Sequence, residues 1–160
     1  MSTTIELPSV TDYMKSHVVE VFETMLATKA HLLEGHPVPE TLERVSGSVG
    51  FAGETINGAV YLHLTPRFAT KATATLLGLP AEEPVGEADI NDAVGEFTNM
   101  LTGGLKSWLC DSGAACAVST PAIIRGTAFA IEPGPNVQRE TLVFDCQGDT
   151  VTVELHVKTS

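Results

Sequence analysis

The sequence predicts an α+β fold, in which an antiparallel sheet has two long helices and one shorter helix packed on one face. Two segments carry apolar residues at helical spacing, and runs near the C-terminal end read as strands. The order is a helix, two strands, two helices and then three or four strands, which is typical of an antiparallel sheet covered by helices. The 160 residues are about one domain in length, so we expect a single domain spanning 1–160.

The first element is a long amphipathic helix over residues 11–33. Its apolar residues recur at i, i+4, i+7, i+8 and i+11, and Ser9 with Asp12 forms a candidate capping pair. Gly35 has the chemistry of a helix C-cap, and two prolines follow it. Residues 1–9 precede this helix and are expected to form a flexible segment.

A hairpin of two strands is expected next, at residues 42–53 and 59–64. The segment between them contains the step Asn57-Gly58, and an Asn-Gly pair is typical of a tight hairpin turn.

The shorter helix is predicted over residues 66–77. Thr65 and Pro66 have the chemistry of an N-cap and of the first helical position, and Gly78 follows as a C-cap residue. Residues 79–86 contain two prolines and two glutamates and are expected to form a surface loop.

The second long helix is predicted over residues 88–109, and the strands of the C-terminal part follow it. The last strand alternates cleanly between apolar and polar residues, and the preceding Gln147-Gly148-Asp149 reads as a hairpin turn. The expected strands are residues 115–118, 123–131, 141–146 and 150–158.

Composition excludes several classes of function. Nine basic residues against twenty acidic residues give a formal net charge of -11, and the basic residues are scattered singly. Such a chain has no basic patch for nucleic acid or for an anionic membrane surface. The odd number of cysteines, three, and an N-terminal sequence without a secretory pattern predict reduced thiols in a cytoplasmic protein. No segment reaches the roughly 18 apolar residues of a membrane span.

Common catalytic and cofactor motifs are missing from the sequence. The five histidines are spread along the chain without metal-ligand spacing, so we expect no metal site. There is also no phosphate-binding glycine loop and no G-x-S-x-G nucleophile motif.

The helix over residues 88–109 carries an unusual polar face. At about 100° per residue, Asp92, Glu96, Asn99 and Gly103 project to the side opposite the apolar residues. Each glycine costs up to about 1 kcal/mol relative to alanine in a helix interior, so stability alone would not select them. Close approach of another helix or of the sheet is the alternative explanation for Gly95 and Gly104, and it applies best to Gly104, nearer the apolar side, and less to Gly103.

The Glu-x-x-Asn spacing is weak evidence by itself. A second instance, Glu54 to Asn57, lies in the expected hairpin turn, where asparagine has an ordinary explanation. The surrounding sequence therefore has to carry the interpretation.

The run from Gly95 to Gly103 reads Gly-Glu-x-x-Asn-Met-x-x-Gly, and here the chain resembles the CheC/CheX/FliY phosphatases of bacterial chemotaxis. The expected order of elements is similar to that of the family over nearly the whole chain. The first helix has Glu20 and Glu23 but no asparagine three residues after either, so a second copy of the motif is absent. This single motif favours the CheX type.

The resemblance implies hydrolysis of the aspartyl phosphate on a CheY-type response regulator. In this interpretation Asn99 orients the attacking water and Glu96 pairs with a receiver lysine. Gly95 and Gly103 leave room for the partner, while Asp92 shares the face mainly as a solvated charge. The family implies a homodimer formed through sheet edges. The chain itself needs no cofactor, because the Mg²⁺ belongs to the receiver. Two alternatives stay open: a module that docks a receiver or another signalling protein without hydrolysis, and a domain that binds a small molecule.

Overall fold

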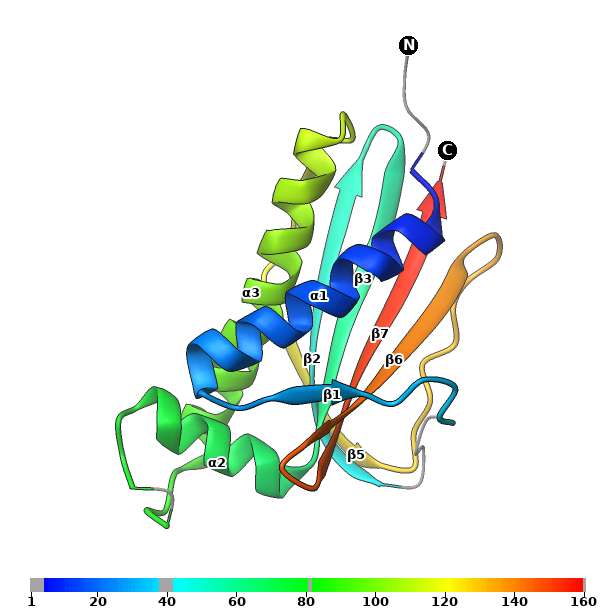
Figure 1. The fold of residues 1–160 in the computed structure, drawn as a ribbon. Coiled ribbons are helices and arrows are strands. Elements are labelled where there is room, and N and C mark those ends of the chain that lie inside the picture. Colours follow the sequence, from blue (N-terminus) through cyan, green and yellow to red (C-terminus); the bar gives the residue numbers. More distant parts are fainter. Residues whose placement is uncertain (1–4, 38–41, 81, 160) are drawn as a thin grey trace.

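The computed structural model describes residues 5–37, 42–80 and 82–159. Within these residues the chain forms three helices and seven strands (Figure 1). In chain order they are α1 (Leu7–Leu26), β1 (Ala30–Leu32), β2 (Glu43–Gly53), β3 (Ile56–Leu64), α2 (Pro66–Leu76), α3 (Glu87–Asp111), β4 (Cys116–Val118), β5 (Ala122–Thr127), β6 (Gln138–Cys146) and β7 (Asp149–Thr159).

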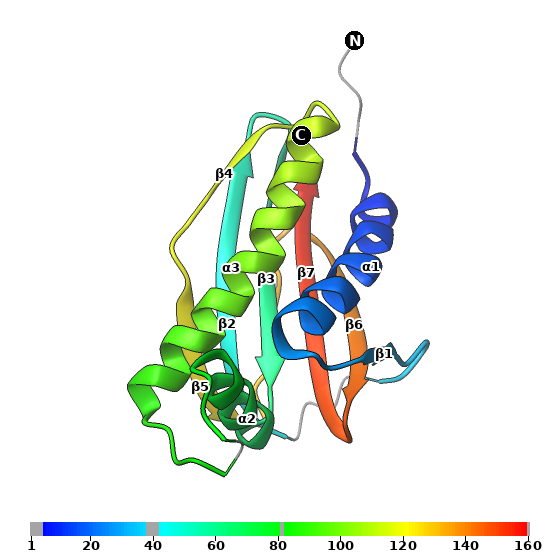
Figure 2. The same cartoon turned by 60° about the vertical axis from the view of Figure 1, so that its left-hand side comes forward.

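The strands form one antiparallel sheet in the order β1-β6-β7-β3-β2, and both β4 and β5 pair with β2. The three helices cover one face of this sheet, with α3 running along β2 and α1 crossing nearer β7 and β6 (Figures 1 and 2). The predicted α+β class, with two long helices and a shorter one on one face of an antiparallel sheet, is confirmed.

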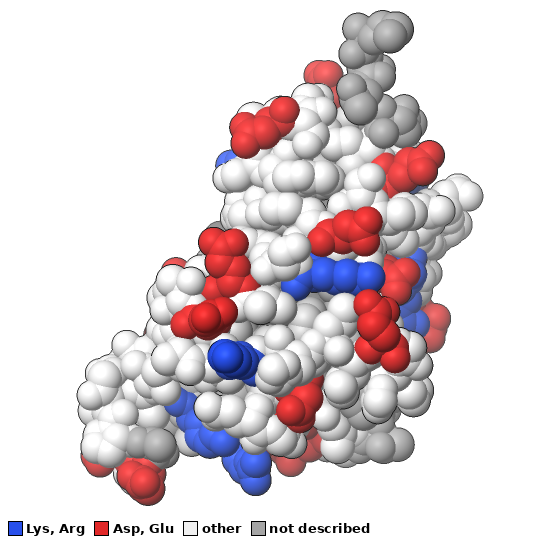
Figure 3. All heavy atoms as spheres, viewed as in Figure 1, with Lys and Arg blue, Asp and Glu red and all other residues white. Residues whose placement is uncertain are grey.

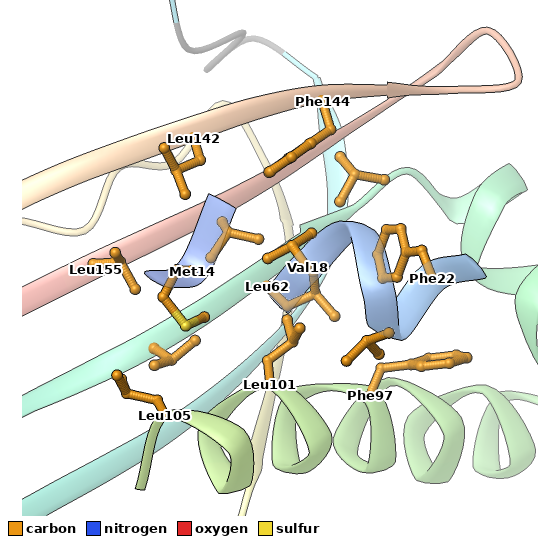
Figure 4. Packing of buried hydrophobic residues seen from close by; sticks show 14 of the residues in the cluster. Met14, Val18, Phe22, Leu62, Phe97, Leu101, Leu105, Leu142, Phe144 and Leu155 are labelled. Carbon is orange, nitrogen blue, oxygen red and sulfur yellow. The ribbon is translucent and has the colours of Figure 1, made fainter. Parts of the chain in front are cut away.

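The core lies between the helices and the sheet (Figure 4). Alternate residues of the strands meet the apolar stripes of α1 and α3, as expected when period-two and period-3.6 patterns face each other. Fully buried members of this layer are Met14, Val18, Phe22, Leu62, Phe97, Leu101, Leu105, Phe144 and Leu155.

Helix α1 differs from the prediction at both ends. It begins at Leu7, four residues earlier than predicted, so it includes the last three residues of the segment that was expected to be flexible. Ile5 and Leu7 are buried, whereas Glu6, Pro8 and Ser9 are exposed. Residues 1–4 of that segment lie outside the described residues. The helix ends at Leu26, where Ala27 adopts a left-handed conformation with φ 49° and its N–H donates to the carbonyl oxygen of Glu23.

The last residues of the predicted helix form the edge strand β1 instead. Ala30 pairs with Cys146 and Leu32 with Phe144, so β1 provides backbone partners for the end of β6. This pairing joins residues more than one hundred positions apart, which the helical periodicity of the segment could not reveal. Gly35 has a positive φ of 70°, but it lies in the connection after β1 and caps no helix.

The hairpin of β2 and β3 is confirmed, but its predicted turn is wrong. The turn lies at Glu54 and Thr55, whereas Asn57 pairs with Ala52 inside the ladder. Gly58 also lies in β3, where a Cβ atom would overlap the backbone carbonyl oxygen of His156 on β7. Glycine there permits close contact between strands and does not form the turn.

The remaining boundaries shift by a few residues. Helix α2 follows the prediction closely, since the Thr65 hydroxyl accepts a hydrogen bond from the Phe68 N–H at 3.1 Å and Gly78 has a φ of 69°. Strand β5 ends at Thr127 instead of residue 131, because Ala128 takes a left-handed φ of 55°, which ends the extended conformation. Strand β6 starts three residues earlier than expected, at Gln138.

Candidate functional site

Helix α3 holds the candidate site, and its position against the sheet is set by a glycine. Thr98 is fully buried against β2, and its hydroxyl donates to the Val94 carbonyl oxygen at 2.7 Å. A Cβ atom on Gly47 would overlap that hydroxyl. The absence of a side chain on Gly47 therefore allows α3 to lie directly on the sheet.

A second glycine sets the contact between α3 and α1. A Cβ atom on Gly104 would overlap the imidazole of His17, whose Nε2 lies 3.2 Å from the carbonyl oxygen of Met100. Tyr13 stacks on both His17 and Trp108, with ring centroids 5.2 Å and 5.1 Å apart. The explanation of Gly104 by close approach of another helix is thus confirmed.

With Thr98 held against the sheet, the Glu-x-x-Asn motif faces outward. Glu96 is exposed and Asn99 is half-buried, one helical turn further along the same face. Among the described residues, no side chain pairs with or hydrogen-bonds to either Glu96 or Asn99. Both polar groups are therefore available to a molecule outside this chain.

The motif borders a hollow of about 370 Å³ between α3 and the segment that leads into β5. The structure brings four of the five predicted site residues together here, and Gly103 does not line the hollow. An added Cβ on Gly103 would meet open space, so no packing contact requires glycine at that position. The lining residues are Asn91, Asp92, Gly95, Glu96, Asn99, Pro121 and Ile123.

Gly95 lies on the floor of this hollow and is itself buried. A Cβ atom there would come within 3.3 Å of the Pro121 Cγ and 3.9 Å of the Ile123 Cδ1. Glycine thus keeps α3 close to the segment that leads into β5, which agrees with the close-approach explanation given for Gly95. Contact between Gly95 and a partner stays a prediction.

Sequence reasoning missed Pro121 and Ile123 as part of the site. A strand was predicted at residue 123, but no pattern indicated that it would lie beside Asn99. Their proximity follows from the pairing of β5 with β2, on which α3 also rests.

Acidic and basic side chains are distributed over the helix-covered side of the protein without one dominant patch (Figure 3). This distribution is typical of a solvated surface that carries the net charge of -11 without one specific partner. Net charge alone therefore does not locate the site.

A larger hollow of about 550 Å³ lies between α1, β6 and the connection after β1. It contains neither Glu96 nor Asn99, and its lining mixes charged and apolar residues without a recognisable catalytic arrangement. Size alone therefore does not identify the site in this molecule.

The opposite face of the sheet carries a buried polar network that sequence reasoning did not anticipate. Ser46 Oγ lies 2.6 Å from His63 Nδ1, and His63 Nε2 lies 3.1 Å from Glu154 Oε1. The other oxygen of Glu154 lies 2.5 Å from His156 Nε2 and 3.2 Å from Arg139 Nε. These contacts resemble a Ser-His-Glu triad, but Ser46 is completely buried, so a substrate has no access to its hydroxyl.

Burial lowers the pKa of His63, although the hydrogen bond to Glu154 acts in the opposite direction. Burial alone would raise the pKa of Glu154. The hydrogen bonds from His63 and His156, with the charge of Arg139, outweigh that effect and lower the pKa of Glu154. At neutral pH these pKa directions favour a neutral His63 beside an ionised Glu154. We therefore assign this network to the stability of the fold and not to catalysis.

Features of two other classes of protein, metal-binding and membrane-spanning, are absent from the described residues. Within residues 5–37, 42–80 and 82–159, no three His, Cys, Asp or Glu side chains gather in a way that could hold a metal ion. None of the helices in that part of the chain combines the length and the apolar character needed to cross a bilayer.

Comparison with known proteins identifies the family. Residues 45–146 match the family model described as chemotaxis phosphatase CheX, whereas no curated protein matches the chain. The structure is similar to that of CheX from Vibrio vulnificus, with a TM-score of 0.80, 24% identity, and coverage of 99% of this chain and 100% of that one. A CheX from Desulfovibrio desulfuricans gives a TM-score of 0.78 at 23% identity, covering 94% of this chain and 99% of the other.

A third similar structure comes from a complex. It is the CheX-CheY-BeF3-Mg complex from Borrelia burgdorferi, with a TM-score of 0.71, 18% identity, and coverage of 93% of this chain and 97% of that one. At these identities the structural matches show a shared fold, and the family model covers well over half of the sequence. The chain belongs to the CheX family of chemotaxis phosphatases.

Proposed function

We propose that this protein hydrolyses the aspartyl phosphate of a CheY-type receiver domain. The observation that carries the proposal is the outward-facing pair Glu96 and Asn99, which no other described side chain engages and which lies beside an open hollow. Family membership and the CheX-CheY complex of a similar protein support this choice of partner. Such a substrate would place the protein in the cytoplasm.

The chemistry requires positioning more than a strong nucleophile. An acyl phosphate is already a reactive mixed anhydride, so water placed in line with the phosphorus atom can displace the aspartate carboxylate. Asn99 would accept a hydrogen bond from that water through its carboxamide oxygen. The new bond joins the water oxygen to phosphorus, the bond between phosphorus and the aspartate oxygen breaks, and inorganic phosphate is released.

Glu96 would align the two proteins. Its carboxylate is exposed on the same face as Asn99, so it can pair with a lysine of the receiver and fix the direction in which Asn99 enters. Gly103 would leave space above the helix, and Asp92 would border the contact as a solvated charge. The Mg²⁺ that receivers use belongs to the partner, and this chain would contribute only side chains.

The test measures loss of phosphate from phosphorylated CheY-type receivers of the source organism, with and without the purified protein. Asn99→Ala is expected to lower the accelerated rate by roughly 100-fold, the magnitude typical of removing one positioned polar group from an active site. Asn57→Ala is the matched control, because Asn57 ends the other Glu-x-x-Asn sequence but lies in β3.

Two outcomes would contradict this proposal in different ways. If the wild-type protein binds a receiver but leaves its phosphate lifetime unchanged, the protein is a docking module. If Asn99→Ala and Asn57→Ala both retain full activity, the protein is a phosphatase but the role proposed for Asn99 is wrong.

The proposed enzyme also forms a homodimer through a sheet edge. Strand β1 pairs only with residues 144–146 of β6, so the outer edge of residues 138–142 has no strand partner among the described residues. Strand β5 presents the second such edge. Sedimentation at micromolar concentration should give a dimer. Thr141→Pro and Thr127→Pro, each at a position whose backbone N–H faces away from the neighbouring strand, should show which edge is used. A monomeric wild-type protein would contradict this assembly.

A further inference from the structure

The hollow beside Asn99 has a second wall, formed by Pro121 and Ile123. This wall is apolar, in contrast to the polar face of α3 opposite it. Ile123 is half-buried and also packs against the hydrophobic core, so its side chain has a defined position at the edge of the hollow.

Both ends of this wall are anchored to other elements. At one end, the Ser119 N–H donates to the Gly50 carbonyl oxygen at 2.8 Å, and the Ser119 hydroxyl accepts from the Gly50 N–H at 2.9 Å. At the other end, Arg125 donates to Asn91 Oδ1 through Nη2 at 2.7 Å and through Nε at 3.2 Å. The width of the hollow is therefore set within the folded protein before any partner arrives.

Neighbouring isoleucines of β5 point to opposite faces of the sheet. Ile123 faces α3, whereas Ile124 pairs with Ser46, whose side chain joins the network on the other face. Ile124 is 37% exposed and does not border the hollow. The two residues differ in environment but not in type, which makes them a matched pair for mutation.

We infer that Pro121 and Ile123 form an apolar docking site for the receiver, occupied by an apolar side chain from a receiver loop beside the phosphorylated aspartate. This inference rests on the proposed function. A receiver whose phosphate reaches Asn99 must cover the same hollow, so its loop lies against Pro121 and Ile123. Burial of apolar surface there stabilises the complex, and this hydrophobic interaction does not require a specific bond geometry.

Such a contact should act on binding and not on the chemical step. The loop remains against the wall in the ground state and in the transition state, so its loss raises KM and leaves kcat nearly unchanged. Loss of the Asn99 side chain should instead lower kcat and leave KM nearly unchanged. The ratio of the two effects separates a docking residue from a residue that positions water.

The experiment compares Ile123→Thr and Pro121→Ser with Ile124→Thr in steady-state dephosphorylation of the receiver. Ile123→Thr and Pro121→Ser should each raise KM by about fivefold to tenfold, as expected for losing most of one buried apolar side-chain contact, with kcat within about twofold. Ile124→Thr should leave both constants unchanged. Urea unfolding of each variant identifies any loss of the fold, and Pro121→Ser provides the test if Ile123→Thr is unstable.

Unchanged KM in folded Ile123→Thr and Pro121→Ser, or an equal rise in Ile124→Thr, would overturn the docking site while the phosphatase activity stands. If the wild-type protein does not accelerate hydrolysis, calorimetric binding of the same receiver replaces KM. A fivefold weaker Kd for Ile123→Thr but not for Ile124→Thr then supports the docking site although hydrolysis has failed. A wild-type protein that binds no receiver overturns both.

Discussion

The hydroxyl of Thr98 on α3 occupies the space that a side chain on Gly47 of β2 would need. Thr98 is the residue just before Asn99, so the same contact that brings the helix onto the sheet directs Asn99 away from it. The geometry of the candidate site therefore depends on a glycine that lies outside the motif.

Gly47→Ala should destabilise the protein and impair the site. The added methyl group has to displace Thr98 or the backbone of α3, and such overpacking costs about 1–3 kcal/mol. Gly50→Ala, in the same strand, is the control, because its Cβ would meet its nearest neighbours at 3.6 Å and 3.7 Å. Urea unfolding should separate the two variants, and equal free energies of unfolding would show that the Gly47 contact is not required.

Glu96→Gln should reduce kcat/KM for receiver dephosphorylation by about tenfold or more. Glutamine keeps the shape of the side chain but removes the charge, and a hydrogen bond to a charged group contributes about 1.5–3 kcal/mol. The free energy of unfolding should not change, because Glu96 is exposed. Glu23→Gln removes a charge that is also exposed, from α1, and should have no effect on kcat/KM. Similar losses in both variants would indicate a general charge effect in place of a specific pair.

Acid should destabilise the fold through the network on the far face of the sheet. The pKa of His63 is lowered from 6.5 in the folded state, so the unfolded chain takes up this proton first. The contribution of His63 is complete above pH 6.5 and is lost as the pH falls toward its folded pKa. Glu154, with a pKa lowered from 4.5, adds a further loss at lower pH.

The measurement is the free energy of unfolding between pH 7 and pH 5. His63→Gln should show a shallower decline than the wild-type protein, and His31→Gln, which alters an exposed histidine, should keep the wild-type slope. A wild-type stability that rises on acidification would contradict the role of this network.

The three cysteines should differ in reactivity toward a thiol reagent at pH 8. Cys110 is exposed and should be modified first. Cys146 is completely buried, and burial with the nearby charges of Asp145 and Asp149 raises its pKa to about 12, so its thiol should react only when the protein unfolds. Mass spectrometry of the modified peptides gives the order, and early modification of Cys146 would show that the β1–β6 edge opens readily.

Local patterns were enough to predict much of the helix layer. The spacing of apolar residues on α3 placed Glu96 and Asn99 on its outer face, and Thr65 with Gly78 marked the ends of α2 correctly. These predictions succeeded because each depends on residues within a few turns of one helix.

The same reasoning failed where distant residues compete for a segment. Helical spacing continued past Leu26, but pairing of Ala30 with Cys146 converts the following residues into a sheet edge. The Asn57-Gly58 step has the composition of a turn, yet contact between β3 and β7 places it inside a strand. Local chemistry contains no information about a partner strand one hundred residues away.

The sequence by itself therefore determined the class of fold, the family motif and the outward direction of Asn99, because these follow from local periodicity and residue identity. Only the tertiary structure decided what surrounds Asn99. Ile123 reaches it because β5 pairs with β2, and α3 rests on β2 through Gly47. Packing of α3 and β5 on the same strand, β2, creates the hollow, and that packing cannot be predicted from any single segment of the sequence.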